Sequence, residues 1–91
     1  MQRDHAEVIA LDALGWMAEA ELLERFQTAT GAHRDAIVAG ARDPAFLGAV
    51  LDFVMQEDEW VTGFCRTRGY SNDSFAAARS ALPGGDLPHW T

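Results

Sequence analysis

Apolar side chains recur every three or four residues along most of the chain, which is the spacing that brings them onto one face of an α-helix. In residues 4–19, Ile9 and Met17 belong to such a face, whereas Asp12 and Glu19, seven residues apart, belong to a polar stripe on the opposite side. No run of four or more residues alternates convincingly between apolar and polar, as a strand would. The pattern therefore predicts an all-α fold.

Residues that start or stop helices divide the chain into about six short helices. Asp4, with Glu7 three residues later, forms a capping box for the first helix. Gly31 supplies a left-handed stop, and Asp43 followed by Pro44 is a strong start signal. The predicted helices span residues 4–19, 20–30, 33–41, 58–68 and 72–82, with a further one that begins at Pro44. We expect them to form a compact bundle.

The helix that begins at Pro44 is apolar on nearly all sides. Only Gly48, Asp52 and Gln56 form a narrow strip that is not strongly apolar. A helix with this pattern is typical of the centre of a helical protein, because every one of its apolar sides must be covered. We therefore expect it to be the most buried element.

The two halves of the chain resemble each other weakly. The segments LDALGWMAEAELLERFQTATG and LDFVMQEDEWVTGFCRTRG both begin with Leu-Asp, and both end with a glycine five residues after a phenylalanine. Two three-helix repeats would account for this likeness. Chance matching of ordinary helix boundaries accounts for it equally well, and the sequence leaves both interpretations open.

The acidic stretch QEDE, residues 56–59, lies between two apolar runs. It could form a catalytic or metal-binding carboxylate group, or it could be the junction between two helices. Carboxylates at a junction are stabilised by the partial positive charge at the start of the following helix. The junction is the favoured interpretation.

Composition narrows the function classes. Among 91 residues, 48% are apolar, the formal net charge is −7 at pH 7, and all seven basic side chains other than histidine are arginines. An acidic surface disfavours nucleic-acid binding, which requires clustered positive charge. The single cysteine, the absence of a signal-peptide pattern and the absence of a long apolar run predict a cytoplasmic protein that does not span a membrane.

Residues with catalytic or ligand-binding chemistry are few and dispersed. His5, His33 and His89 lie in three separate segments, and Cys65 has no cysteine or histidine at metal-ligand spacing. Cys65 follows Phe64, which favours a packing position over a nucleophile. The glycines form no phosphate-binding loop. We therefore expect no enzyme, and no catalytic, metal-binding or cofactor-binding residues.

The end of the sequence is distinct from the helical part. Pro83, Gly84 and Gly85 terminate the last helix, so the predicted division is a single helical domain at 1–85 and a C-terminal tail at 86–91. The tail contains Leu87, His89 and Trp90, which are candidates for binding a partner or for docking on the domain itself. We expect self-docking, because a buried indole offsets much of the entropy cost of ordering the tail.

The segments DPAFLGAVLDFVMQEDEWVTGFC, LLERFQTATG and ALPGGDLPHW resemble a family of small bacterial all-helical proteins known as domain of unknown function 3572. The likeness covers nearly the whole chain, and its most specific element is Asp-Pro-x-Phe followed by Leu-Asp-Phe. The resemblance implies a single helical domain. It implies no activity and no catalytic residues.

Two functions are compatible with these features. The first is a non-catalytic protein-interaction module, monomeric or homodimeric, with an acidic helical surface that binds a protein partner. The alternative is a helical protein that binds a small apolar ligand between the two halves, through Trp16, Phe53, Met55 and Trp60. Core packing would explain these four side chains equally well.

Overall fold

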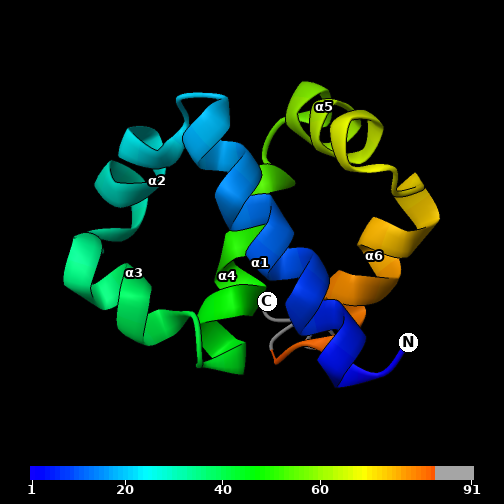
Figure 1. The fold of residues 1–91 in the computed structure, drawn as a ribbon, viewed down its shortest axis with the longest axis horizontal. Helices are drawn as coiled ribbons and strands as arrows, with labels where there is room; N and C mark the ends of the chain where they lie inside the picture. The colour runs from blue at the N-terminus through cyan, green and yellow to red at the C-terminus, as the bar shows by residue number, and fades with distance from the viewer. Residues whose placement is uncertain (84–91) are drawn as a thin grey trace, which may run out of the picture.

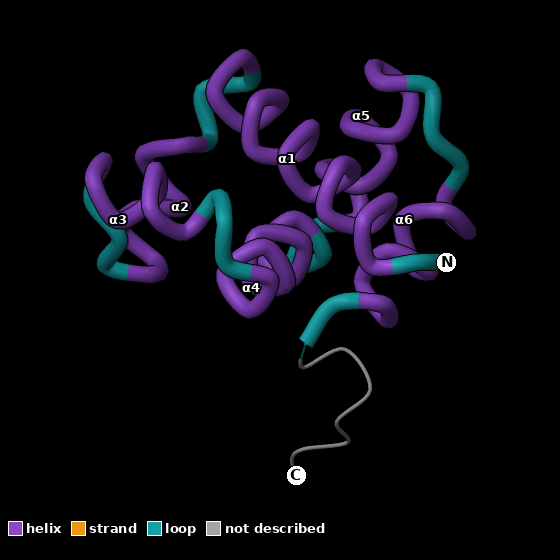
Figure 2. The backbone as a smooth tube through the Cα atoms, turned by 60° about the horizontal axis from the view of Figure 1, so that its bottom comes forward, coloured by secondary structure: helices purple, strands orange, loops and turns teal. Residues whose placement is uncertain are grey.

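The computed structural model describes residues 1–83, and within them the chain forms six α-helices and no strand. The helices are α1 (Arg3–Glu19), α2 (Leu23–Thr30), α3 (Arg34–Gly40), α4 (Pro44–Val54), α5 (Asp58–Arg68) and α6 (Asn72–Ala81). Short turns connect them, as the tube in Figure 2 shows. The predicted all-α bundle of six short helices is confirmed.

Helices α1 and α4 form the centre of the molecule. They pack against each other, while α2 and α3 lie to one side of the pair and α5 and α6 to the other (Figure 1). Helix α1 also packs along α6. The arrangement encloses α4, and Leu47, Val50, Leu51 and Val54 are almost completely inaccessible to solvent. The expectation that this helix lies at the centre is confirmed.

Aromatic side chains extend the core outward from α4 in two clusters. In one, Phe26 of α2 makes edge-to-face contacts with Phe46 and Phe53 of α4, at centroid distances of 5.8 and 5.3 Å. In the other, Phe64 of α5 lies 5.9 Å from the rings of both Trp16 and Phe75. Edge-to-face pairs contribute roughly 0.5–1.5 kcal/mol each beyond the area that they bury. The clusters therefore attach the outer helices to the central pair.

Several predicted helix ends are confirmed. The Asp43 carboxylate accepts a hydrogen bond from the Ala45 N–H at 3.0 Å, directly before Pro44. Gly31 and Gly69 end α2 and α5 with φ angles of 74° and 79°, in the left-handed region that glycine adopts without strain. Ser71 caps α6 by accepting from the Ser74 N–H, a cap that the sequence analysis did not identify.

The predicted capping box at Asp4 and Glu7 is wrong. Helix α1 begins one residue earlier, at Arg3, and Gln2 occupies the N-cap position without a side-chain hydrogen bond. The Gln2 carbonyl accepts from the Ala6 N–H, so Asp4 lies inside the first turn. Its carboxylate is therefore placed near the positive end of the helix dipole instead of at the cap.

Helix α2 begins at Leu23 and not at Ala20 because the chain makes a helix-ending turn first. Glu21 has a φ of 61°, and it is the one residue other than glycine with positive φ within residues 1–83. The Leu22 N–H donates to the Met17 carbonyl at 2.8 Å, and the Glu21 N–H donates to that of Ala18. These are the two bonds of a Schellman motif, in which glycine is the usual residue at the position of Glu21.

The two halves share helix caps but differ in packing. Gly31 and Gly69 end equivalent helices with nearly the same backbone angles. However, α1 has 17 residues whereas α4 has 11, and α1 packs extensively along α6 while α4 meets α3 over a small area. The structure therefore supports an equivalence of helix boundaries and not of the complete three-helix units.

Replacement of Leu51 by alanine should lower the free energy of unfolding by about 2–5 kcal/mol, because the side chain is fully enclosed and its loss leaves a cavity. Urea denaturation measures the change. Val8→Ala on α1 is the control, since Val8 is 53% exposed and should change stability much less. A loss below about 1 kcal/mol for Leu51→Ala would place the core elsewhere.

Replacement of Glu21 by glycine should raise the free energy of unfolding by about 0.5–1 kcal/mol. The left-handed conformation costs a residue with a side chain about 1–2 kcal/mol, of which the greater freedom of glycine in the unfolded chain cancels a part. Ala18→Gly is the matched control, because Ala18 lies in α1 with a right-handed backbone and should be destabilised. Equal effects of the two substitutions in urea melts would contradict the explanation.

Candidate functional site

A surface hollow of about 320 Å³ separates α2 from the junction of α4 and α5. We refer to it as the α2–α5 cleft. Its lining residues are Glu24, Arg25, Thr28 and Ala29 of α2, Phe53 and Gln56 at the end of α4, and Trp60 of α5. These residues come from both halves of the chain, so the cleft lies where the two halves meet.

The apolar part of the α2–α5 cleft is built from aromatic rings. Trp60 stacks on Phe53 with a centroid distance of 5.0 Å and an interplanar angle of 24°. Phe53 is buried, whereas Trp60 is only partly buried and leaves some of its indole accessible to solvent. The guanidinium carbon of Arg25 lies 5.5 Å from the Trp60 ring centroid, within the range of a cation–π interaction. The cleft thus offers a rigid aromatic surface beside a positive charge.

Three carboxylates lie at the start of α5, between Gln56 and Trp60 of the cleft lining in the sequence. Glu57, Asp58 and Glu59 are exposed, with Glu57 at the N-cap of α5 and the other two in its first turn. The interpretation of residues 56–59 as a helix junction is confirmed. Among the lining residues of the cleft, Glu24 of α2 is the acidic one.

Within residues 1–83, no group of three or more histidine, cysteine, aspartate or glutamate side chains is arranged to hold a metal ion. Both histidines in this part of the chain are exposed. His5 lies in α1, and His33 is the N-cap residue of α3. In the same part of the chain, no helix has both the length and the apolar character of a membrane span.

Cys65 is a packing residue, as its position next to Phe64 predicts. The side chain is 4% exposed, and its thiol lies 3.7 Å from the Ser71 carbonyl oxygen, to which it can donate. Burial raises the pKa of the Cys65 thiol, which keeps it protonated at neutral pH. Arg68 does not activate it, because the Arg68 guanidinium pairs with Glu19 of α1 at 2.8 Å.

Tyr70 and Asp12 form a hydrogen bond that the sequence analysis did not identify. The Tyr70 hydroxyl donates to the Asp12 carboxylate, and the Tyr70 ring packs 5.4 Å from that of Phe64. Asp12 was expected to belong to a solvated stripe on the first helix. The two residues lie 58 positions apart, so no local pattern could pair them.

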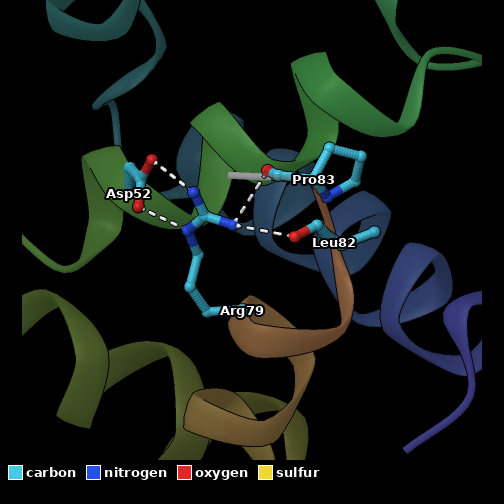
Figure 3. Close-up of polar contacts among 4 residues, drawn as sticks. All are labelled: Asp52, Arg79, Leu82 and Pro83. Carbon is cyan, nitrogen blue, oxygen red and sulfur yellow. Dashed lines mark hydrogen bonds and ion pairs between the residues drawn. The ribbon is translucent and has the colours of Figure 1, made fainter. Parts of the chain in front are cut away.

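Arg79 of α6 links this helix to α4. The Arg79 guanidinium makes a two-pronged ion pair with Asp52, with nitrogen–oxygen distances of 2.5 and 2.8 Å. Its remaining amino group donates to the Pro83 carbonyl at 3.2 Å and lies 3.5 Å from that of Leu82 (Figure 3). Asp52 belongs to the strip of α4 that is not strongly apolar. The end of α6 therefore packs against this strip.

A second hollow, of about 260 Å³, lies between α5 and α6, and we refer to it as the α5–α6 hollow. It is lined by Met55, by Asp58, Val61 and Thr62 of α5, and by Asn72, Phe75 and Ala76 of α6. Its floor is apolar because Phe75 is buried, and Met55 is 47% exposed at its edge.

The four residues of the expected ligand pocket are not brought together. Phe53 and Trp60 line the α2–α5 cleft, Met55 lines the α5–α6 hollow, and Trp16 packs beside Phe64 in the core. The other candidates from the sequence, Leu87, His89 and Trp90, lie outside the residues that the structure describes.

The fold and its surface hollows define a small all-α domain. A family profile described as "Protein of unknown function (DUF3572)" matches residues 3–85. The chain therefore belongs to this family, which confirms the resemblance found in the sequence. No curated protein and no solved structure matches it.

The hydrogen bond to Asp12, together with burial and the nearby carboxylate charge, raises the pKa of Tyr70 from 10.0 to about 12. Since the folded state then holds the phenolic proton more tightly, this contribution to stability is complete below pH 10 and is lost as pH rises through about 12. Tyr70 is the one tyrosine of the chain, so absorbance at the tyrosinate band follows it alone.

In Asp12→Ala, the pKa of Tyr70 should fall toward its ordinary value. Asp12→Asn keeps an acceptor and removes the charge, so it should give an intermediate pKa. Circular dichroism at each pH verifies that the helices persist. A folded wild-type protein whose tyrosine ionises near pH 10 would contradict the contact.

Proposed function

We propose that the chain is a non-catalytic, cytoplasmic protein-interaction module, and that the α2–α5 cleft binds an apolar side chain on a basic segment of its partner. The observation that carries the proposal is the partly exposed Trp60, stacked on Phe53 and flanked by Arg25. Tryptophan and arginine are enriched at the energetic centres of protein interfaces.

The geometry of Trp60 favours binding over a purely structural role. Phe53 stacks on its ring and the guanidinium of Arg25 lies over it, so little side-chain entropy is lost when a partner covers the surface that stays accessible. The polar residues at the edge of the cleft, Thr28 and Gln56, can form the hydrogen-bonding rim of an interface.

Charge supports a basic partner. The formal net charge is −7, Glu24 lines the cleft, and Glu57, Asp58 and Glu59 are exposed at the start of α5. Complementary charge accelerates association, and its effect weakens with salt because the Debye length falls to about 8 Å at physiological ionic strength. The same surface repels nucleic-acid phosphates.

The protonation and the contacts of Cys65, the single cysteine, support the non-catalytic assignment. The Cys65 thiol is buried beside a carbonyl oxygen, and its pKa is raised, which is the opposite of an activated cysteine. A single cysteine also leaves no intrachain disulfide, in agreement with a reducing compartment.

A small apolar ligand is the weaker alternative. The α2–α5 cleft is near the lower limit of ligand-site volumes, roughly 300 Å³. Glu24, Arg25, Thr28 and Gln56 place polar groups around it, and Trp16 and Met55 lie elsewhere. A partner segment that combines one apolar anchor with positive charges fits this lining better.

The experiment compares the wild-type protein with Ala29→Arg as bait in a lysate of the source organism. Ala29 is exposed and lines the cleft, so an arginine there should fill the hollow without disturbing the core. Ala36→Arg on α3 is the matched control, because Ala36 is an exposed helical alanine outside the lining. We expect a partner that binds the wild type and the control, binds Ala29→Arg at least about tenfold more weakly, and dissociates at high salt.

Equal recovery of that partner by Ala29→Arg and by the wild type would exclude the cleft as its binding site. Recovery of no protein above background by any of the three baits would contradict the interaction module itself. Thermal unfolding of each bait, followed by circular dichroism, verifies that all three are folded.

A further inference from the structure

We propose that the α5–α6 hollow binds a lysine or arginine side chain of the same partner segment whose apolar side chain occupies the α2–α5 cleft. The proposal rests on the function proposed for that cleft and adds a second site to it. It assigns the apolar anchor of the segment and its positive charge to two different hollows.

The two hollows have linings of similar chemistry. Each contains a buried phenylalanine, an alanine, a side-chain amide, and a carboxylate that lies four residues before a threonine on one helix. These residues are Phe53, Ala29, Gln56, Glu24 and Thr28 in the α2–α5 cleft, and Phe75, Ala76, Asn72, Asp58 and Thr62 in the α5–α6 hollow. Both hollows therefore offer an apolar floor with polar groups beside it.

The two linings differ in charge. In the α2–α5 cleft, the positive charge of Arg25 balances the negative charge of Glu24. The lining of the α5–α6 hollow has the carboxylate of Asp58 and no basic side chain, which leaves a formal charge of −1. Because opposite charges attract across an interface and like charges repel, a basic side chain of the partner is favoured in the α5–α6 hollow over the cleft.

Asp58 has no cation of its own among the described residues. Within residues 1–83, the ion pairs join Arg68 to Glu19 and Arg79 to Asp52. The carboxylate of Asp58 is therefore available to a cation from another chain. A pair formed inside the hollow is screened by salt less than a pair between fully solvated side chains.

The helix ends at the hollow leave its surroundings negative. Asp58 is the first residue of α5 and Asn72 is the first residue of α6, and the start of each helix carries a partial charge of about +0.5. The first turns of the same two helices contain three carboxylates, those of Asp58, Glu59 and Asp73. Three negative charges outweigh a partial positive charge of about +1 in total, so the region favours a cation.

The rest of the lining suits a long basic side chain. Lysine and arginine bury their aliphatic stems against apolar surface while their charged ends keep polar contacts. The stem can pack on Phe75 and on Met55, which is 47% exposed. The side chains of Asp58, Thr62 and Asn72 contain oxygen acceptors, which match a charged end that has only donors.

The positions of the two hollows on α5 set the spacing of the two side chains of the partner. Trp60 lines the cleft and Val61 lines the hollow, and adjacent residues point about 100° apart around a helix. On a helix of about 10–12 Å diameter this angle corresponds to about 10 Å along the surface, which an extended segment spans in about three residues. The apolar and the basic side chain should therefore lie about three or four positions apart.

The test uses random dodecapeptides displayed on phage, selected on the wild-type protein and counter-selected on Ala29→Arg. We expect the selected peptides to combine a large apolar residue with a lysine or arginine at this spacing. Isothermal titration calorimetry of the synthetic peptides should show that Asp58→Asn weakens binding at least about tenfold. Glu59→Gln is the matched control, because it removes an adjacent exposed carboxylate that lines neither hollow and should weaken binding much less.

A double-mutant cycle identifies the side chain that occupies the hollow. Norleucine in place of the basic residue of the peptide keeps the aliphatic stem and removes the charge. With this peptide, Asp58→Asn should lose most of its effect, because the two changes remove the same ion pair. Circular dichroism verifies that each protein variant is folded.

The outcomes separate this proposal from the function on which it rests. Peptides that discriminate against Ala29→Arg but bind Asp58→Asn as tightly as the wild type would overturn the second site and leave the cleft intact. Equal effects of Asp58→Asn and Glu59→Gln would reduce the contribution of Asp58 to net charge alone. Coupling of the basic residue to Glu24→Gln instead of Asp58→Asn would place the cation in the cleft. A selection that yields no peptide discriminating against Ala29→Arg would contradict the proposed function and the second site together.

Discussion

The burial of α4 is the constraint on which the rest of the structure depends. A helix that is apolar on nearly all sides has no face that water can cover, so the remaining helices must enclose it. Helices α1, α3, α5 and α6 all pack against α4, and Phe26 connects α2 to it through the rings of Phe46 and Phe53. The short outer helices gain most of their stability from this burial, because isolated helices shorter than about 12–15 residues are marginal in water.

The one strip of α4 that is not apolar determines how the helical region ends. Gly48 leaves room for the Pro83 carbonyl, and Asp52 holds the Arg79 guanidinium that donates to the same carbonyl. A large apolar side chain at either position would block this approach. The strip therefore fixes the exit of the chain with polar contacts at a place where the rest of α4 uses apolar ones.

Local signals in the sequence predicted most of the helices, and long-range contacts account for what they missed. Asp43 with Pro44, and the glycines at 31 and 69, act within one turn of their own position, so the boundaries they predict are confirmed. The turn at Glu21 was missed because its left-handed backbone is occupied by a residue that rarely adopts it.

The contacts of the candidate sites were less predictable than the helices. The pairs Tyr70–Asp12 and Arg79–Asp52 join residues 58 and 27 positions apart, and helical periodicity carries no information on such distances. Phe53 and Trp60 were two of the four side chains expected to share one ligand pocket, and these two line the α2–α5 cleft. The sequence could not show that Arg25 approaches them from α2, or that Trp16 and Met55 lie elsewhere.

Both surface hollows border the first half of α5, and the position of its core contacts explains why. The buried residues of this helix, Phe64 and Cys65, lie in its second half. Its first half begins with Asp58 and Glu59, which favour solvent and the positive end of the helix dipole. Trp60 and Val61 are adjacent in sequence, so they point about 100° apart around the helix, one toward α2 and the other toward α6. The acidic start of α5 thus keeps this part of the helix at the surface, and its apolar residues are left accessible on two sides, where a partner or another segment can cover them.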